Sequence, residues 1–118
     1  MLILFAYLIG GIILHVVIPV SNVLRKIGQD ISKSRRRRRI TMALLSERAG
    51  ILPKTLGRIE KGDPSTSIGA YASVLFSLGL IERFRDIADA NYDLVGRELE
   101  EELLPKRVRL PKRIGVNN

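Results

Sequence analysis

The chain has 118 residues, of which 46% are hydrophobic, and this is typical of one ordinary domain with a buried core. Twenty Lys and Arg residues against twelve Asp and Glu give a net charge of +8, which favours a polyanionic partner: nucleic acid, an acidic protein surface or an anionic membrane. There is no cysteine, which excludes disulfides, thiolate metal sites and a cysteine nucleophile. The single histidine, His15, lies in an apolar run and does not indicate a catalytic or metal site.

Residues 1–20 form an apolar N-terminal segment without a charged side chain, close to the roughly 20 residues that span a bilayer. A signal peptide is disfavoured, because no Lys or Arg precedes the apolar run and no A-x-A site follows it. Three interpretations remain: a start codon assigned too far upstream, with translation beginning near Val20 or Val23; a membrane anchor with its basic side in the cytoplasm; or an added packing helix. An anchor would leave a DNA duplex little room to dock.

Residues 21–90 show helical periodicity interrupted by turn signals, which predicts an all-α bundle. Five helices are expected, over about 22–38, 42–48, 53–61, 67–78 and 81–88.

Three local features support these bounds. Thr41 is the predicted N-cap of the second helix, and the third begins at Pro53 and stops at Gly62. On the first helix, one face is expected to carry Val23, Ile27 and Ile31. On the fifth, the inner positions are expected to be Phe84, Ile87 and Ala88.

Residues 34–40 read SRRRRRI, which is either a solvated basic arm or part of a folded site. At 100° per residue, five consecutive arginines point all around a helix, and only Arg35 and Arg39 share a face. Extending the apolar row of Ile27 and Ile31 by four residues reaches Arg35, so this arginine is predicted to face the core and to need a carboxylate partner. The next three arginines point elsewhere.

The stretch LLSERAGILPKTLGRIEKG, residues 44–62, supplies a glutamate and a family resemblance. From Ile27 to Leu80 the chain resembles the helix-turn-helix domain of the lambda-repressor and Cro-like class, the XRE family. The matching features are an IG-x-x-I opening, an Arg late in the first helix, an L-x-E-x-A-G-I turn, a T-L-x-R-I-E-K-G end of the recognition helix and a closing LGL. In that family an arginine of the first helix pairs with a glutamate near the end of the third, which implies an ion pair between Arg35 and Glu60.

The resemblance also implies how a double-stranded DNA operator is bound: the third helix enters the major groove and the second lies across it against the phosphates. Lys54 and Arg58, one turn apart, are the candidates for contacts to guanine, with Thr55 between them. The expected DNA-binding residues are Thr41, Met42, Pro53, Lys54, Thr55, Gly57, Arg58 and Lys61, with nonspecific attraction from Arg36, Arg37, Arg38 and Arg39.

Three residues depart from the family pattern. Met42 stands where the family usually has Gln, and Leu52 replaces an N-cap Ser or Thr. Gly57 should weaken the third helix by roughly 1 kcal/mol relative to Ala, or else it allows close approach to DNA. These departures leave the operator sequence undetermined.

Residues 91–118 combine an acidic segment with a short basic tail, and are expected to contact a partner or a second copy. Leu94, Val95, Leu99 and Leu103 indicate one more amphipathic segment, whose glutamates are more simply a solvated face than a metal site. KRVRL, residues 106–110, is either a short strand or a disordered tail. This arrangement is similar to HipB-like antitoxins encoded beside HipA-type kinases, which implies a HipA-like kinase toxin as partner.

Two function classes are therefore expected. The first is a cytoplasmic, DNA-binding transcriptional repressor, with an autoregulating antitoxin as its specific form. The second is a membrane-anchored or protein-binding helical module without specific DNA binding. An enzyme is disfavoured, because no nucleophile with a base, metal cluster or phosphate-cradling loop is evident, and no cofactor is expected. A homodimer is expected through the fourth and fifth helices, with a seam of Leu75, Leu78, Leu80, Ile81 and Phe84.

Overall fold

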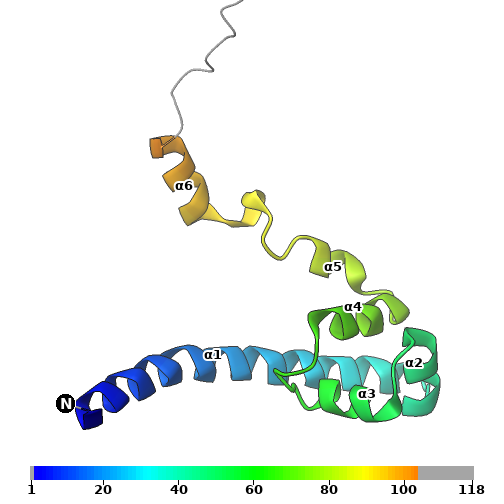
Figure 1. Cartoon of the computed structure of the whole chain (residues 1–118). Helices are drawn as coiled ribbons and strands as arrows, with labels where there is room; N and C mark the ends of the chain where they lie inside the picture. The colour runs from blue at the N-terminus through cyan, green and yellow to red at the C-terminus, as the bar shows by residue number, and fades with distance from the viewer. Residues whose placement is uncertain (1, 104–118) are drawn as a thin grey trace, which may run out of the picture. The chain divides into compact units, whose positions relative to one another are not determined.

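The structure, a computed structural model, describes the backbone of residues 2–103 and the side chains of residues 10, 11 and 16–103. This part of the chain is all-α and contains no strand, which confirms the predicted class. Its elements are α1 (Leu2–Arg37), α2 (Met42–Ala49), α3 (Pro53–Glu60), α4 (Ile68–Ser77), α5 (Ile81–Arg85), the 3-10 turn η1 (Ala90–Tyr92) and α6 (Leu94–Leu103) (Figure 1). The chain divides into two compact units, Met1–Ile81 and Glu82–Asn118, whereas the sequence placed a boundary near residue 90.

The first unit is a bundle built on the C-terminal half of α1. There α3 packs along α1, and α2 contacts both α3 and α4 (Figure 1). Each large apolar side chain buried in such a core stabilises the fold by roughly 1.5–3 kcal/mol. The core residues, each at most 5% exposed, are Ile31, Leu45, Leu56, Ile59, Tyr71, Val74 and Leu78.

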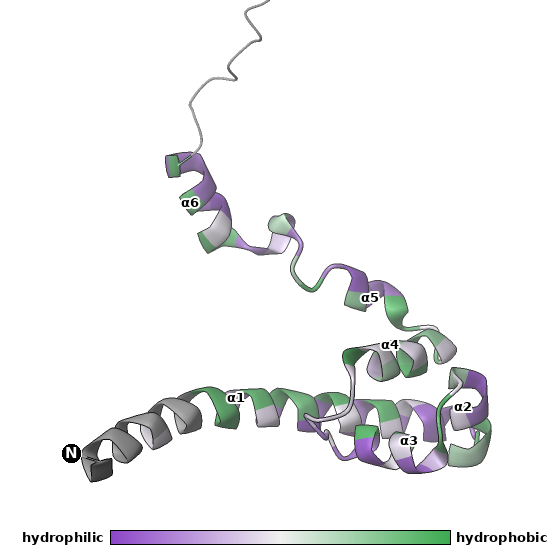
Figure 2. Cartoon of the chain, viewed as in Figure 1, coloured by the Kyte–Doolittle hydropathy of each residue, from purple (hydrophilic) through white to green (hydrophobic). Residues whose placement is uncertain are grey.

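The first helix is much longer than predicted, because α1 begins at Leu2 and not near residue 22. Pro19 lies inside it and removes one backbone donor without ending the helix. The part of α1 that follows its grey start is coloured as hydrophobic in Figure 2. The apolar side chains on either side of Pro19 do not pack on the core, because Val16, Val17, Ile18 and Val20 are between 46% and 55% exposed. The expected boundary at residue 20 therefore marks a change in hydropathy and not the start of a helix. Over the residues searched, none of the helices combines the length and apolar character needed to cross a membrane.

The predicted inward face of α1 is confirmed at Ile31, which is 1% exposed, and at Ile27, but it is rotated at its start, where Leu24 and not Val23 packs against the core. Val23 is 58% exposed, while Leu24 and Ile27 are half-buried against the core. Gly28 explains the rotation, because a Cβ there would lie 2.5 Å from the carbonyl oxygen of Ile59. The missing side chain lets the backbone of α1 touch the end of α3, and this contact fixes which side of α1 faces the bundle.

The ends of the short helices follow the sequence closely. The Thr41 hydroxyl accepts a hydrogen bond from the Leu44 N–H at 3.0 Å, which confirms Thr41 as the N-cap of α2. Ser67 caps α4 in the same way, accepting from the Ala70 N–H at 3.1 Å. At the start of α3, Leu52 makes no side-chain cap, and Pro53 occupies the first turn.

In the second unit, α5 ends at Arg85, so the predicted extension to Ala88 is wrong. Ile87 is 65% exposed and is not an inner position, and Ala88 is also exposed, whereas Phe84 is half-buried. No residue of α5 is fully buried. Because an isolated helix of five residues is not stable in water, α5 depends on the partial packing of Ile81 and Phe84. In α6 the predicted apolar positions are present but exposed by 51–81%: Leu94, Val95, Leu99 and Leu103. The possible strand at 106–110 and the basic tail lie outside the described residues.

Candidate nucleic-acid interface

The turn between α2 and α3 occupies only residues 50–52. Gly50 ends α2 with a left-handed φ of 69°, and its N–H donates to the Glu47 carbonyl at 3.1 Å. The Ile51 N–H reaches back to the Ser46 carbonyl at 3.0 Å, which completes the C-terminal cap. These bonds close the turn at the end of α2, and α2 packs against α3 across it.

One face of α3 is cationic and open to solvent. Lys54, Arg58 and Lys61 follow i, i+4, i+7 spacing and are all exposed, while Leu56 and Ile59 are fully buried on the opposite face. The ion pairs among the described side chains are Lys26–Asp30, Arg35–Glu60 and Arg85–Glu82, and none of them uses these three cations. The face can therefore neutralise an external anion.

The other expected contact residues surround this face. Thr41 and Pro53 are exposed at the first turns of α2 and α3, and Thr55 is half-buried. Met42 is half-buried and packs against the core. Its Cε also lies 3.8 Å from the place that a Cβ on Gly57 would occupy. Met42 therefore borders the α3 surface at Gly57.

The pair expected between Arg35 and Glu60 is present and is nearly buried, with side chains 13% and 10% exposed. Arg35 Nε donates to Glu60 Oε2 at 2.7 Å, and Nη2 donates to Oε1 at 3.2 Å. Arg35 Nη1 also donates to the Ile40 carbonyl at 3.1 Å. Hydrogen bonding to Glu60 raises the pKa of Arg35, against the opposing effect of burial. The C-terminal end of the cationic helix is thus anchored to α1.

The rest of the arginine run does not behave as one helical surface. α1 ends at Arg37, and Arg39 adopts a left-handed φ of 56° outside the helix. The Ile40 N–H donates to the Arg35 carbonyl at 3.4 Å across this turn. The prediction that Arg35 and Arg39 share a helix face is therefore wrong, because the helix stops before Arg39.

Arg38 has a structural contact that the sequence reasoning missed. Its guanidinium donates to the carbonyl of Leu78 at 2.9 Å, to the carbonyl of Ser34 at 3.0 Å and to the Ser34 hydroxyl. Leu78 is the C-cap of α4, and a positive charge at the C-terminal end of a helix interacts favourably with the helix dipole. The sequence signal for this contact was the i, i+4 spacing of Ser34 and Arg38, which continues the inward row of α1. Arg38 is exposed, as are Arg36 and Arg37, so what sets it apart is its hydrogen bond to α4 and not burial.

The loop that follows α3 is held by a carboxylate. Asp63 accepts hydrogen bonds from the N–H and the hydroxyl of Ser65, both at 2.8 Å, and from the Thr66 hydroxyl at 3.3 Å. The Ser65 hydrogen bonds are the main reason that the pKa of Asp63 is lowered. The buried Tyr71 hydroxyl donates to the Asp63 carbonyl at 2.9 Å, and burial raises the pKa of Tyr71. This loop joins the end of α3 to α4.

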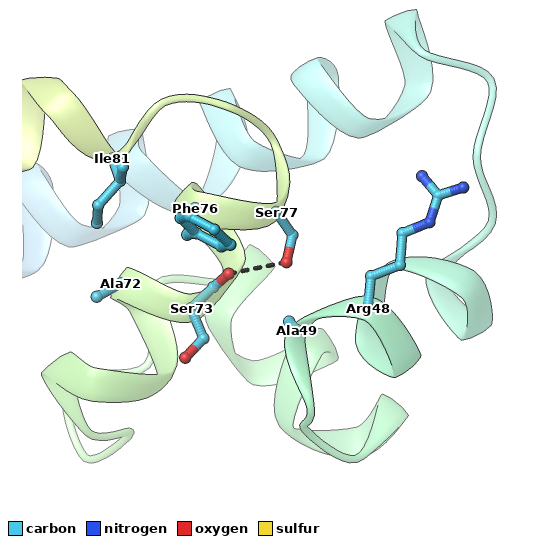
Figure 3. Close-up of a pocket in the computed structure, with 7 residues that line it drawn as sticks. All are labelled: Arg48, Ala49, Ala72, Ser73, Phe76, Ser77 and Ile81. Carbon is cyan, nitrogen blue, oxygen red and sulfur yellow. Dashed lines mark hydrogen bonds between the residues drawn. The ribbon is translucent and has the colours of Figure 1, made fainter.

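A shallow groove of about 310 Å³ lies between α2 and α4 (Figure 3). Phe76, at its centre, is 70% exposed, and Ser77 Oγ donates to the Ser73 carbonyl at 3.0 Å beside it. In the expected dimer seam, Leu78 is only 3% exposed and belongs to the core, so it is not available to a partner. Sequence reasoning omitted Phe76, the most exposed large apolar residue at this groove. The groove is lined by Arg48, Ala49, Ala72, Ser73, Phe76, Ser77 and Ile81.

Comparisons with family models, curated proteins and solved structures found no match to this chain. Within the described residues, no group of three or more His, Asp or Glu side chains is arranged to hold a metal ion. Function therefore has to be inferred from the cationic face of α3 and the contacts that position it.

Proposed function

We propose that this chain is a sequence-specific DNA-binding transcriptional repressor with a Cro-like helix-turn-helix. The observation that carries the proposal is the exposed cationic face of α3, formed by Lys54, Arg58 and Lys61, on a helix joined to α2 by residues 50–52. A three- or four-residue turn containing Gly is typical of helix-turn-helix motifs, and their second helix reads the major groove.

In this proposal α3 lies in the major groove, with Arg58 and Lys54 directed at guanine O6 and N7. Thr55 stands beside them, and the first turns of α2 and α3, at Thr41 and Pro53, lie near phosphates. The exposed Arg36 and Arg37 add attraction for DNA of any sequence, together with the net charge of +8. Arg35 and Arg38 act on the fold instead, because their guanidinium groups are engaged within the bundle.

The repressor is proposed to act as a homodimer, since one recognition helix reads too few base pairs for useful specificity. The groove between α2 and α4, with the exposed Phe76, is the proposed contact between copies. The narrower proposal, an autoregulating antitoxin with a HipA-type kinase as partner, is supported only by the resemblance of YASVLFSLGL and LPKRVRLPK to HipB-like proteins.

The test is selection of duplexes from a random library by the full-length protein, followed by titration of the selected and random duplexes at several salt concentrations. The proposal expects a symmetric selected sequence and a steep loss of affinity with salt. Arg58→Ala should relax the preference at one base position by roughly 1–3 kcal/mol, whereas Arg37→Ala should weaken binding to all duplexes alike.

Equal losses on selected and random duplexes for Arg58→Ala would contradict the assigned base contact. Failure to select any sequence, combined with salt-insensitive binding to another protein, would favour the protein-binding module. The exposed apolar side chains of α1, from Val16 to Val20, are the observation in favour of that alternative.

A further inference from the structure

The bundle contains glycines of two kinds. Gly28 and Gly62 are required by the fold, because a Cβ at Gly28 would lie 2.5 Å from the Ile59 carbonyl oxygen and one at Gly62 would lie 2.6 Å from the Arg25 Cα. Gly57 is different. A Cβ there would meet only the Met42 Cε, at the ordinary contact distance of 3.8 Å, and Gly57 does not have a positive φ.

Gly57 therefore weakens α3 without a reason inside the fold, since glycine in a helix is unfavourable relative to alanine. Its position suggests the reason. At 100° per residue it lies about 60° from Lys54 and about 100° from Arg58, so it borders the cationic face on the side of Met42. The absent side chain leaves a notch in that face, whose floor is the helix backbone and whose edge is the Met42 methyl group.

We propose that Gly57 is a specificity-determining residue. At Gly57 the α3 backbone approaches the floor of the major groove, and the notch left by the missing side chain accommodates the C5-methyl group of a thymine. This inference rests on the proposed DNA-binding function. The notch offers Cα–H and the Met42 methyl group, which are apolar surfaces, and among the base edges in the major groove only thymine presents an apolar group. Lys54 and Arg58 carry long side chains and Gly57 carries none, so the α3 backbone can come closest to the bases at Gly57.

The experiment compares Gly57→Ala with Gly69→Ala in the full-length protein. Gly69 is an exposed glycine of α4, and a Cβ there would meet only Ser67 Oγ, at 3.9 Å, so both substitutions fit the fold. Both variants should melt at or above the wild-type temperature. Only Gly57→Ala should weaken binding to the selected duplex, by roughly tenfold, the effect of one lost base contact. Binding to random duplex should be unchanged in both.

The thymine is identified by replacing each thymine of the selected duplex with uracil, which removes only the methyl group. One replacement in each half-site should weaken the wild-type protein about as much as Gly57→Ala does, and Gly57→Ala should be indifferent to that replacement. Wild-type binding that is unaffected by every uracil replacement overturns the assignment of the notch to thymine.

Two other results would also overturn the inference. Gly57→Ala with wild-type affinity and preference would show that the notch contacts nothing, while the DNA-binding function would stand. A melting temperature well below the wild-type value for Gly57→Ala would show that the fold itself needs the glycine. If the wild-type protein selects no duplex, the proposed function fails first, and this outcome is distinct from both.

Discussion

Arg35 and Glu60 form a two-pronged ion pair that joins α1 to the last residue of α3, with Nε–Oε2 and Nη2–Oε1 distances of 2.7 and 3.2 Å. Arg35 also bonds the Ile40 carbonyl, so one guanidinium connects the end of α1, the turn after it and the cationic helix. The orientation of that helix therefore depends on a contact that lies away from its exposed face.

We expect Glu60→Gln to lower the free energy of unfolding by about 3 kcal/mol or more, because it leaves the nearly buried Arg35 charge without its partner. Denaturant unfolding measures this loss. Asp30→Asn is the control: it breaks the Lys26 pair, whose side chains are 75% and 55% exposed, and should lower the free energy of unfolding far less, because solvent screens an exposed pair. Equal stabilities for the two variants would show that the buried pair contributes no more than an exposed one.

Within the arginine run, Arg38→Ala should lower the free energy of unfolding by about 1.5–3 kcal/mol, because the carbonyl of Leu78 loses a charged hydrogen-bond donor. Arg37→Ala should stay within about 0.5 kcal/mol of wild type, since the exposed Arg37 guanidinium makes no hydrogen bond to another helix among the described residues. Thermal or denaturant melts of the two variants make the comparison. Equal losses of stability for Arg38→Ala and Arg37→Ala would contradict the structural role given to Arg38.

Stability should depend on pH through Asp63. Its pKa is lowered in the folded state by the Ser65 hydrogen bonds, so its contribution is present above the unfolded value near 3.8 and is lost as pH falls through the folded value. Wild type should therefore melt higher than Asp63→Asn at neutral pH. The gap should begin to shrink as the pH falls below 3.8, where the unfolded Asp63 takes up a proton, and should close only below the lowered folded-state pKa. A gap that stays constant down to a pH of about 2.5 would exclude this role.

Association through the groove between α2 and α4 is tested by Phe76→Glu, which places a charge on a residue that is 70% exposed. Sedimentation of the full-length protein at tens of micromolar should show a dimer for wild type and a monomer for this variant. Tyr92→Glu, at a residue 75% exposed in the second unit, should leave the dimer intact. A dimer that tolerates Phe76→Glu would place the contact elsewhere.

The sequence predicted the parts of the fold that depend on local signals. Thr41, Pro53 and Gly62 mark helix ends by their own backbone and side-chain chemistry, and the bounds of α2, α3 and α4 were predicted to within one residue. Arg35 was predicted to face inward because four-residue spacing extends the buried row through Ile31.

Features that depend on tertiary contacts were missed. Hydropathy separated residues 1–20 from the next helix, although no residue between them ends α1. The rotation that exposes Val23 follows from the close approach at Gly28, which requires knowledge of where α3 ends. The hydrogen bond from Arg38 to Leu78 spans forty residues, so spacing along one helix could not reveal its acceptor.

The continuity of α1 has a mechanical consequence. At 1.5 Å per residue, its 36 residues form a rod about 54 Å long, and the bundle is attached to only its C-terminal half. No loop interrupts α1 between Leu2 and Arg37, and Pro19 is the position inside it where a backbone hydrogen bond is missing and bending is easiest. A partner bound to the N-terminal half would therefore be linked to α3 through this one helix and the Arg35–Glu60 pair, with Pro19 as the point at which the direction of α3 can change.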